Sequence, residues 1–165
     1  MEIKSRFDFR SLVILLYVIC FVAYLIFGLT PAEAAHYDVF TNIEIPSIGL
    51  NSEVTSLSLE DNQLKTPDTI VGSYSRAKNK TLLIGHSGTV FGDLDEVWVG
   101  DAIEYNGASY LVKDIVVERK EDISMRELLS EAETDTLVIM TCAGTYLENN
   151  DATHRLLITA EIMTS

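Results

Sequence analysis

An uncharged apolar run at residues 12–29 constrains this chain more than any other feature of its sequence. The run reads LVILLYVICFVAYLIFGL, and its 18 residues are just long enough to cross a bilayer as a helix. Three basic residues precede it, and no Lys or Arg follows until Lys65. Because positive charge stays on the cytoplasmic side of a membrane, residues 1–11 are predicted to form a cytoplasmic tail and residues 12–29 a transmembrane signal-anchor helix.

A cleaved signal peptide is the alternative interpretation of this segment. Ala32 and Ala34 are the small residues that a signal peptidase requires. The apolar run is longer than the roughly 7–15 residues of a signal-peptide core, which favours the uncleaved anchor. Both interpretations export residues 30–165. The anchored form predicts a single-pass protein of the cell membrane whose N-terminus is cytoplasmic and whose main domain is extracellular.

The exported part is acidic and long enough for one domain. Residues 30–165 carry 9 Lys+Arg and 23 Asp+Glu, in a chain whose formal net charge is −13. This balance argues against a nucleic-acid partner, because surfaces that bind phosphates need Lys and Arg. A single hydrophobic core can form in a segment of this length. We expect a tether at residues 30–41 and one domain at residues 42–165.

The two cysteines of the chain are predicted to lie in different environments. Cys20 is inside the apolar run, where it is explained as an apolar residue of the membrane helix. It cannot pair with Cys142 in an exported domain, so Cys142 is an unpaired thiol in a compartment where cysteines are usually oxidised. That thiol is either reactive or buried and inert, and composition favours neither.

The patterning of the exported domain is mostly that of strands. Asn106-Gly107 between two of them is the strongest hairpin signal in the chain. Two short helical segments are expected, one where Ser124 and Glu127 have capping-box spacing and one turn within residues 91–97. Seven or so short strands with few helices predict a mainly β fold, either a closed barrel or a sandwich. The expected strands are residues 43–45, 54–59, 81–84, 102–105, 109–117, 137–141 and 154–162.

Three side chains are candidates for chemistry. Cys142 ends an expected strand, where a loop can expose a reactive group on a rigid frame, and a thiolate needs a nearby base or positive charge. His86 follows the strand at 81–84 among small residues, so its ring can reach a groove. Arg155 lies 13 residues after Cys142, opposite the apolar stripe of its strand, and can stabilise a thiolate or an oxyanion.

The other histidines are given structural roles. His36 is expected to be solvated in the tether. His154 lies on the apolar stripe of the strand at 154–162 and is expected to be packed there. The spacing of cysteine, histidine and arginine is by itself a weak signal, because any domain of this size offers some such triple.

Four passages resemble the sortases, the membrane-anchored cysteine transpeptidases of bacterial cell surfaces. IEIPSIGL at residues 43–50 is similar to the family's first strand, and LIGHS at 83–87 to the strand that leads to its histidine. FGDL at 91–94 with VGDAI at 99–103, and VIMTC at 138–142 with HRLLI at 154–158, continue the likeness in family order. The resemblance implies a sortase-like closed β-barrel of seven or eight strands with one or two short helices.

The resemblance also implies a function and the residues that carry it. Cys142 would be the nucleophile that cleaves a C-terminal sorting motif, typically of LPxTG type, through a thioester acyl-enzyme. His86 would be the general acid and base, and Arg155 would stabilise the oxyanion or the substrate backbone. Thr141 would flank the thiol as a substrate-binding residue. The implied partners are secreted proteins with a sorting motif, an amine acceptor in the cell wall or a pilin, and the membrane.

Departures from the family pattern leave the subclass open. Val138-Ile139 replaces a Thr-Leu pair, which keeps an apolar strand. No extended lid segment precedes Ile43, which argues against the lid-bearing pilin-polymerising class. A non-catalytic sortase-like peptide-binding module and a cysteine hydrolase that cleaves without transfer stay open as alternatives.

No cofactor is expected. Some sortases use calcium, and acidic clusters occur at residues 60–61, 93–96 and 121–122. Calcium takes oxygen ligands from such groups, but a chain this rich in Asp and Glu forms them by chance. A solvated acidic surface is the favoured interpretation, and no metal site is predicted.

Overall fold

The computed structural model describes residues 41–60, 63–148 and 151–164. The chain divides into two compact units, Met1–Val39 and Phe40–Ser165, and every described residue belongs to the second. Within these ranges no helix has the length and apolar character needed to span a membrane. The predicted cytoplasmic tail, signal-anchor helix and nearly all of the tether, with Cys20 and His36, lie outside the described residues.

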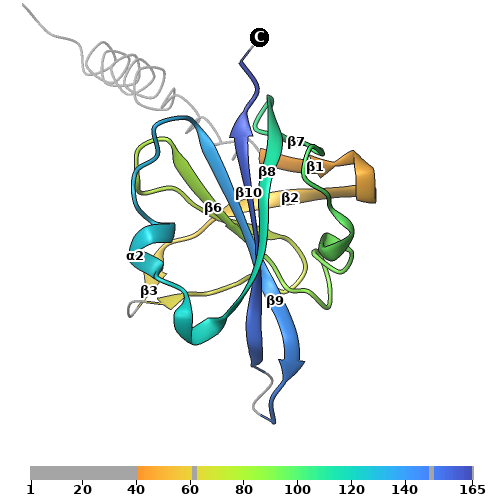
Figure 1. Cartoon of the computed structure of the whole chain (residues 1–165), viewed down its shortest axis with the longest axis vertical. Coiled ribbons are helices and arrows are strands. Elements are labelled where there is room, and N and C mark those ends of the chain that lie inside the picture. The colour runs from red at the N-terminus through yellow and green to blue at the C-terminus, as the bar shows by residue number, and fades with distance from the viewer. Residues whose placement is uncertain (1–40, 61–62, 149–150, 165) are drawn as a thin grey trace, which may run out of the picture. The chain divides into compact units, whose positions relative to one another are not determined.

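Eight strands close into a barrel in the order β1-β2-β5-β6-β9-β10-β8-β7 (Figure 1). The pairs β2·β5 and β6·β9 are parallel, and the other neighbours are antiparallel. The closed barrel predicted from the resemblance is therefore confirmed over the sandwich. The strands are β1 (Thr41–Ile45), β2 (Leu50–Ser56), β5 (Val71–Tyr74), β6 (Lys80–Ile84), β7 (Ala102–Tyr105), β8 (Ala108–Arg119), β9 (Thr136–Tyr146) and β10 (Ala152–Ile162).

Strand alternation fills the inside of the barrel with a single apolar core. Successive side chains of a strand point to opposite faces, and the inward-facing side chains of the strands form this core. In β10 the inward residues are Leu156, Ile158 and Ala160, each at most 5% exposed, as the alternation predicts. Phe91 and Leu94 enter the same core from the segment that holds the short 3-10 turn Leu94–Glu96.

A second, smaller cluster covers the outer face of β6 and β9. Leu82, Ile84 and Val138 are buried there, although they point away from the barrel interior. Two elements outside the barrel contribute apolar contacts to them. These are the hairpin of β3 (Leu59–Glu60) and β4 (Gln63–Leu64), and the segment containing α2 (Met125–Leu128). Figure 1 shows α2 and β3 on the same side of the barrel, beside β6.

Local signals at turns and caps predicted several boundaries. Asn106 and Gly107 have φ values of 51° and 75°, as a tight hairpin between β7 and β8 requires. The side chain of Ser124 accepts a hydrogen bond from the Glu127 backbone N–H at the start of α2. These residues act locally, so their effect can be predicted without knowing the rest of the fold.

The prediction of a strand at 54–59 was wrong in its bounds. The strand β2 begins directly after Gly49, whose φ of 64° turns the chain out of the 3-10 turn Pro46–Ile48. It ends at Ser56, and the side chain of the next residue, Leu57, packs against Gly72 while its N–H donates to the Ser73 carbonyl at 2.7 Å. Neither β5, which contains that glycine, nor the β3–β4 hairpin was predicted from the sequence. The two-residue strands of the hairpin are too short to show a period.

Candidate active site

The parallel pairing of β6 with β9 brings His86 and Cys142 to the same place. Ile84 is opposite Met140 in the register, and both chains continue two residues further to the histidine and the cysteine. The strands stay joined beyond the last pair, because the Gly85 N–H donates to the Met140 carbonyl at 3.4 Å. Equal steps along two parallel strands preserve the face, so both side chains lie on the outer face of the barrel.

Arg155 reaches this face from the neighbouring strand. It is the direct antiparallel partner of Cys142 in the β9·β10 pairing, and directly opposed residues share a face of the sheet. Its side chain is only 13% exposed, whereas Cys142 is partly exposed and His86 is exposed. Three residues far apart in the sequence are therefore side by side on the outside of the barrel wall.

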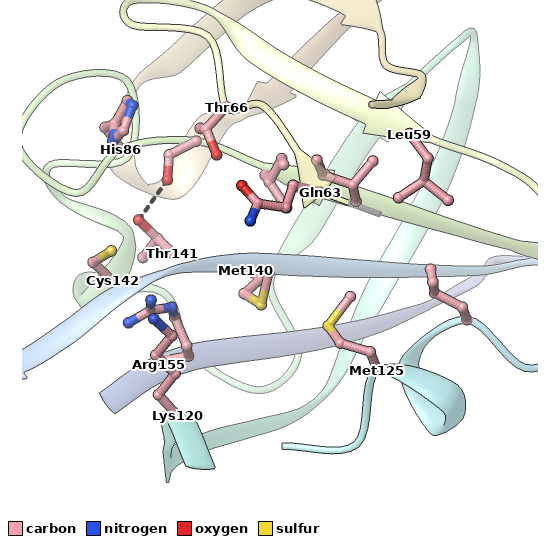
Figure 2. Close-up of a pocket in the computed structure, with 14 residues that line it drawn as sticks. Leu59, Gln63, Thr66, His86, Lys120, Met125, Met140, Thr141, Cys142 and Arg155 are labelled. Carbon is pink, nitrogen blue, oxygen red and sulfur yellow. Dashed lines mark hydrogen bonds between the residues drawn. The ribbon is translucent and has the colours of Figure 1, made fainter. Parts of the chain in front are cut away.

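These residues line one end of a groove with a volume of about 670 Å³. Figure 2 shows His86, Cys142 and Arg155 at one end and Leu59 and Met125 toward the other. The floor is the outer face of β6 and β9, and the hairpin and the α2 segment form walls. Apolar lining is supplied by Leu59, Leu64, Ile84, Met125, Leu129 and Met140. The site thus combines a polar end with an extended apolar surface.

Thr141 is buried rather than presented to solvent. It is 4% exposed, and its hydroxyl donates a hydrogen bond of 2.8 Å to the Gly85 carbonyl (Figure 2). This bond joins the residue before Cys142 to the residue before His86. Thr141 also lines the groove, but its hydroxyl is used to hold the two strands together at the site.

Close packing at Gly85 fixes the backbone directly before His86. A Cβ atom at this position would lie 2.6 Å from Val90 Cγ1 and 2.7 Å from Phe91 Cδ2. The Phe91 ring, 1% exposed, therefore needs the glycine in order to enter the core. The loop after His86 is joined to the end of β9 by a hydrogen bond between the hydroxyls of Ser87 and Tyr146.

Arg155 is held by contacts that the sequence analysis did not anticipate. Its Nη2 donates to Asp151 Oδ1 at 2.9 Å, and its Nη1 donates to the carbonyls of Ala152 and His154 at 2.9 Å each. The other carboxylate oxygen of Asp151 forms an ion pair with Lys120, which also lines the groove. Hydrogen bonds from these two cations lower the pKa of Asp151 to about 2.

Asp151 and Lys120 gave no signal in the sequence. One precedes β10 and the other follows β8, and a single acidic or basic residue near a strand end is ordinary surface. Only the antiparallel pairing of β8 with β10 brings them together. The spacing of Asp151 and Arg155, four residues apart, indicates an ion pair on a helix but not at the start of a strand.

His154 is partly buried. Its ring packs against Gly144 of β9. A Cβ atom on Gly144 would lie 2.6 Å from its Nδ1, and that nitrogen is hydrogen-bonded to the Thr153 hydroxyl at 2.8 Å. The ring takes the space that a glycine with φ of 77° leaves open.

The acidic clusters do not converge among the described residues. Within the described ranges no group of three His, Cys, Asp or Glu side chains is arranged to hold a metal ion. Glu121 and Asp122 form ion pairs with Arg119, and Asp61 lies outside the described residues. The expectation that the chain has no cofactor stays a prediction, and its dependence on calcium stays open.

Comparison with known proteins identifies the family. A model of the Sortase domain matches residues 43–163. This chain belongs to the sortase family. Sortase A from Corynebacterium diphtheriae, as a lid mutant, superposes with a TM-score of 0.59 at 24% identity, covering 81% of this chain and 75% of that one. Sortase C1 from Streptococcus suis superposes with a TM-score of 0.58 at 25% identity, covering 76% of this chain and 73% of that one.

The subclass stays open within the family. Matches of similar quality occur to a sortase A and to a sortase C1. The segment before Ile43 that would carry a lid lies mostly outside the described residues, so the expectation of a lid-free sortase stays a prediction. A search of curated proteins found none that matches this chain.

Proposed function

We propose that this sortase is a cysteine transpeptidase that cleaves a C-terminal sorting motif of LPxTG type and transfers the acyl group to a cell-surface amine. The observation that carries the proposal is the convergence of Cys142, His86 and Arg155 at one end of a groove. A thiol in such a groove, with an imidazole and a guanidinium nearby, has the groups that acyl transfer needs.

In the acylation half-reaction, the Cys142 thiolate attacks the carbonyl carbon of the scissile peptide bond. Arg155 stabilises the negative charge that develops on the carbonyl oxygen, and it cannot act as a base because it stays protonated. Protonated His86 gives its proton to the departing amine as the C–N bond breaks. The product is a thioester on Cys142 and a free amine fragment.

The second half-reaction reverses these roles with a different amine. The incoming amine attacks the thioester carbon, neutral His86 takes the proton that the nitrogen loses, and the C–S bond breaks to restore the thiolate. Splitting the exchange in this way replaces one difficult amide exchange by two easier steps. Water can attack the same thioester, so hydrolysis competes with transfer.

The groove supports an extended peptide as the substrate. Its apolar lining offers pockets for side chains, as in the recognition of strand-like segments. An anchor at residues 12–29 would keep the site near the membrane. There an exported substrate and an amine acceptor of the cell wall or of a pilin would be within reach, which agrees with the localisation expected from the sequence.

The proposal is tested by product analysis with the full-length chain in detergent. A panel of sorting-motif peptides is incubated with and without glycine or lysine amines, and chromatography separates cleaved from transferred products. We expect cleavage and amine transfer by the native chain and neither by Cys142→Ala. Arg155→Ala is expected to slow acylation by about 10²–10³-fold, as loss of an oxyanion donor does.

The transpeptidase, the hydrolase and the binding module give different results in this experiment. Cleavage without transfer at every amine concentration contradicts transpeptidation and makes the protein a hydrolase. Peptide binding with no product, together with a Cys142 thiol that resists alkylation in the folded state, contradicts an enzyme and supports the binding module. Transfer that persists in Cys142→Ala contradicts the assignment of the nucleophile.

A further inference from the structure

We propose that Asp151 is a positioning residue that holds the Arg155 guanidinium in the orientation in which it meets the substrate. The inference rests on the proposed function, because it assigns Arg155 a partner within the same site. It adds a residue to the cysteine, histidine and arginine to which the family resemblance assigned roles.

A guanidinium has five N–H donors in a fixed plane. Three are used on the protein side: one bond goes to Asp151 Oδ1, and two go to the carbonyls of Ala152 and His154. Among the described residues these are the bonds that Arg155 makes, so one Nη2–H and the Nε–H are left for the groove. Because the group is planar, the direction in which they point is set by these three bonds together, and the bond from Nη2 to the carboxylate is the one that a side-chain substitution can remove.

Asp151 is itself held by other contacts, so it can keep the Arg155 side chain in one orientation. Its Oδ2 is paired with Lys120, in the 3-10 turn that follows β8. Its carbonyl accepts a hydrogen bond of 2.8 Å from the Leu147 N–H across the β9–β10 loop. The carboxylate thus joins the end of β8 to Arg155 in β10, and the backbone carbonyl joins the same residue to the loop after β9.

The negative charge of Asp151 helps to hold the guanidinium, in addition to the hydrogen bond that its carboxylate accepts. The low pKa of about 2 keeps the carboxylate ionised across the working range of an exported protein. Its negative charge partly offsets the two cations that line the groove. Without it, the guanidinium would lose one of its three anchors and its attraction to the loop, and the side chain would sample other rotamers.

The experiment compares acylation by the full-length chain with variants of this loop. The readout is the rate of thioester formation with a sorting-motif peptide over a range of concentrations. Asp151→Ala is expected to lower kcat/KM by about 10-fold to 100-fold, because misplacement of a stabilising group by about 1 Å has effects of this size. Asp151→Glu, which keeps the ion pair, is expected to recover most of the rate. The matched control is Glu148→Ala, which removes the same charge from an exposed position of the same loop.

A double-mutant cycle separates positioning from a general effect on folding. If Asp151 acts through Arg155, adding Asp151→Ala to Arg155→Ala changes the remaining rate by less than about twofold, because coupled residues are not additive. An undiminished loss of rate in the Arg155→Ala background would overturn the proposal. An unchanged rate for Asp151→Ala in the native background would overturn it as well.

A labelling experiment keeps this test separate from that of the proposed function. Phenylglyoxal modifies accessible guanidinium groups, and mass spectrometry of peptides gives the rate at Arg155. Asp151→Ala is expected to raise that rate several-fold over the native chain and over Glu148→Ala. If no peptide acylates the native chain, the proposed function fails. Faster labelling of Arg155 in Asp151→Ala still supports the proposal that Asp151 restrains the Arg155 side chain. Equal labelling rates in Asp151→Ala and in the native chain contradict this restraint, whether or not the chain is acylated.

Discussion

Tyr110 shows how one buried side chain makes stability depend on pH. It lies in the barrel core, 4% exposed, and its hydroxyl donates a hydrogen bond of 3.1 Å to Asp135 Oδ2. Burial, followed by the negative charge of Asp135, raises its pKa to about 12. The folded protein therefore favours the neutral phenol, and this contribution is complete below about pH 10 and is lost as the pH rises toward 12.

We expect Tyr110→Phe to remove this pH dependence. At neutral pH the variant loses the hydrogen bond and leaves Asp135 without that donor, at a cost of about 1–2 kcal/mol in the free energy of unfolding. Denaturant unfolding of both proteins from pH 8 to 11.5 gives the difference in the free energy of unfolding, in which the titration of groups that do not interact with Tyr110 cancels. The difference should shrink above pH 10. A constant difference across the range would contradict the account of Tyr110.

At the scale of single residues, the sequence predicted the groups of the site better than their surroundings. Cys142, His86 and Arg155 could be selected from their strand positions and from the family resemblance. Asp151 and Lys120 could not, because they meet only after β8 and β10 have paired. Such ion pairs are properties of the closed barrel and leave no pattern along the chain.

At the scale of elements, Gly85 allows Val90 and Phe91 to pack against the backbone at the end of β6, directly before His86. A methyl group there would lie within 2.8 Å of three side-chain atoms of Val90 and Phe91. We expect Gly85→Ala to destabilise the fold by about 1–3 kcal/mol, the usual cost of overpacking a core, and to lower the acylation rate by displacing His86. Thermal unfolding and acylation kinetics measure both effects.

The matched control is Gly88→Ala in the same loop. A Cβ atom at Gly88 meets no atom within 4 Å, so this variant is expected to keep both the stability and the rate. Equal behaviour of the two variants would show that the loss of glycine flexibility, rather than the contact with Phe91, determines the effect.

Element prediction succeeded where a pattern repeats within one strand or turn. The alternation of β10 and the Asn106-Gly107 turn are local, and they predicted a strand, its buried face and a hairpin. The parallel pairing of β6 with β9 is not local, because more than fifty residues separate the two strands. Yet this pairing is what places His86 beside Cys142, so the site follows from a contact that periodicity does not reveal.

At the scale of the whole molecule, the barrel explains how three distant residues come to line one groove. The groove lies on the outer face of the wall, and the inner core that supports it is separate from the cluster that lines it. Substitutions in the inner core should therefore act mainly on stability, and those on the outer face mainly on the groove. The family resemblance predicted the closed barrel, because composition and periodicity had left both a barrel and a sandwich open.

The central claim is that Cys142 becomes acylated by a peptide bound in the groove. The most direct measurement is intact-mass spectrometry of the full-length chain, quenched in acid seconds after it is mixed with a sorting-motif peptide, followed by peptide mapping. The account predicts a mass gain equal to the acyl part of the peptide, located on Cys142 and released by added amine. Peptide cleavage with no adduct, or an adduct at another residue, would contradict it.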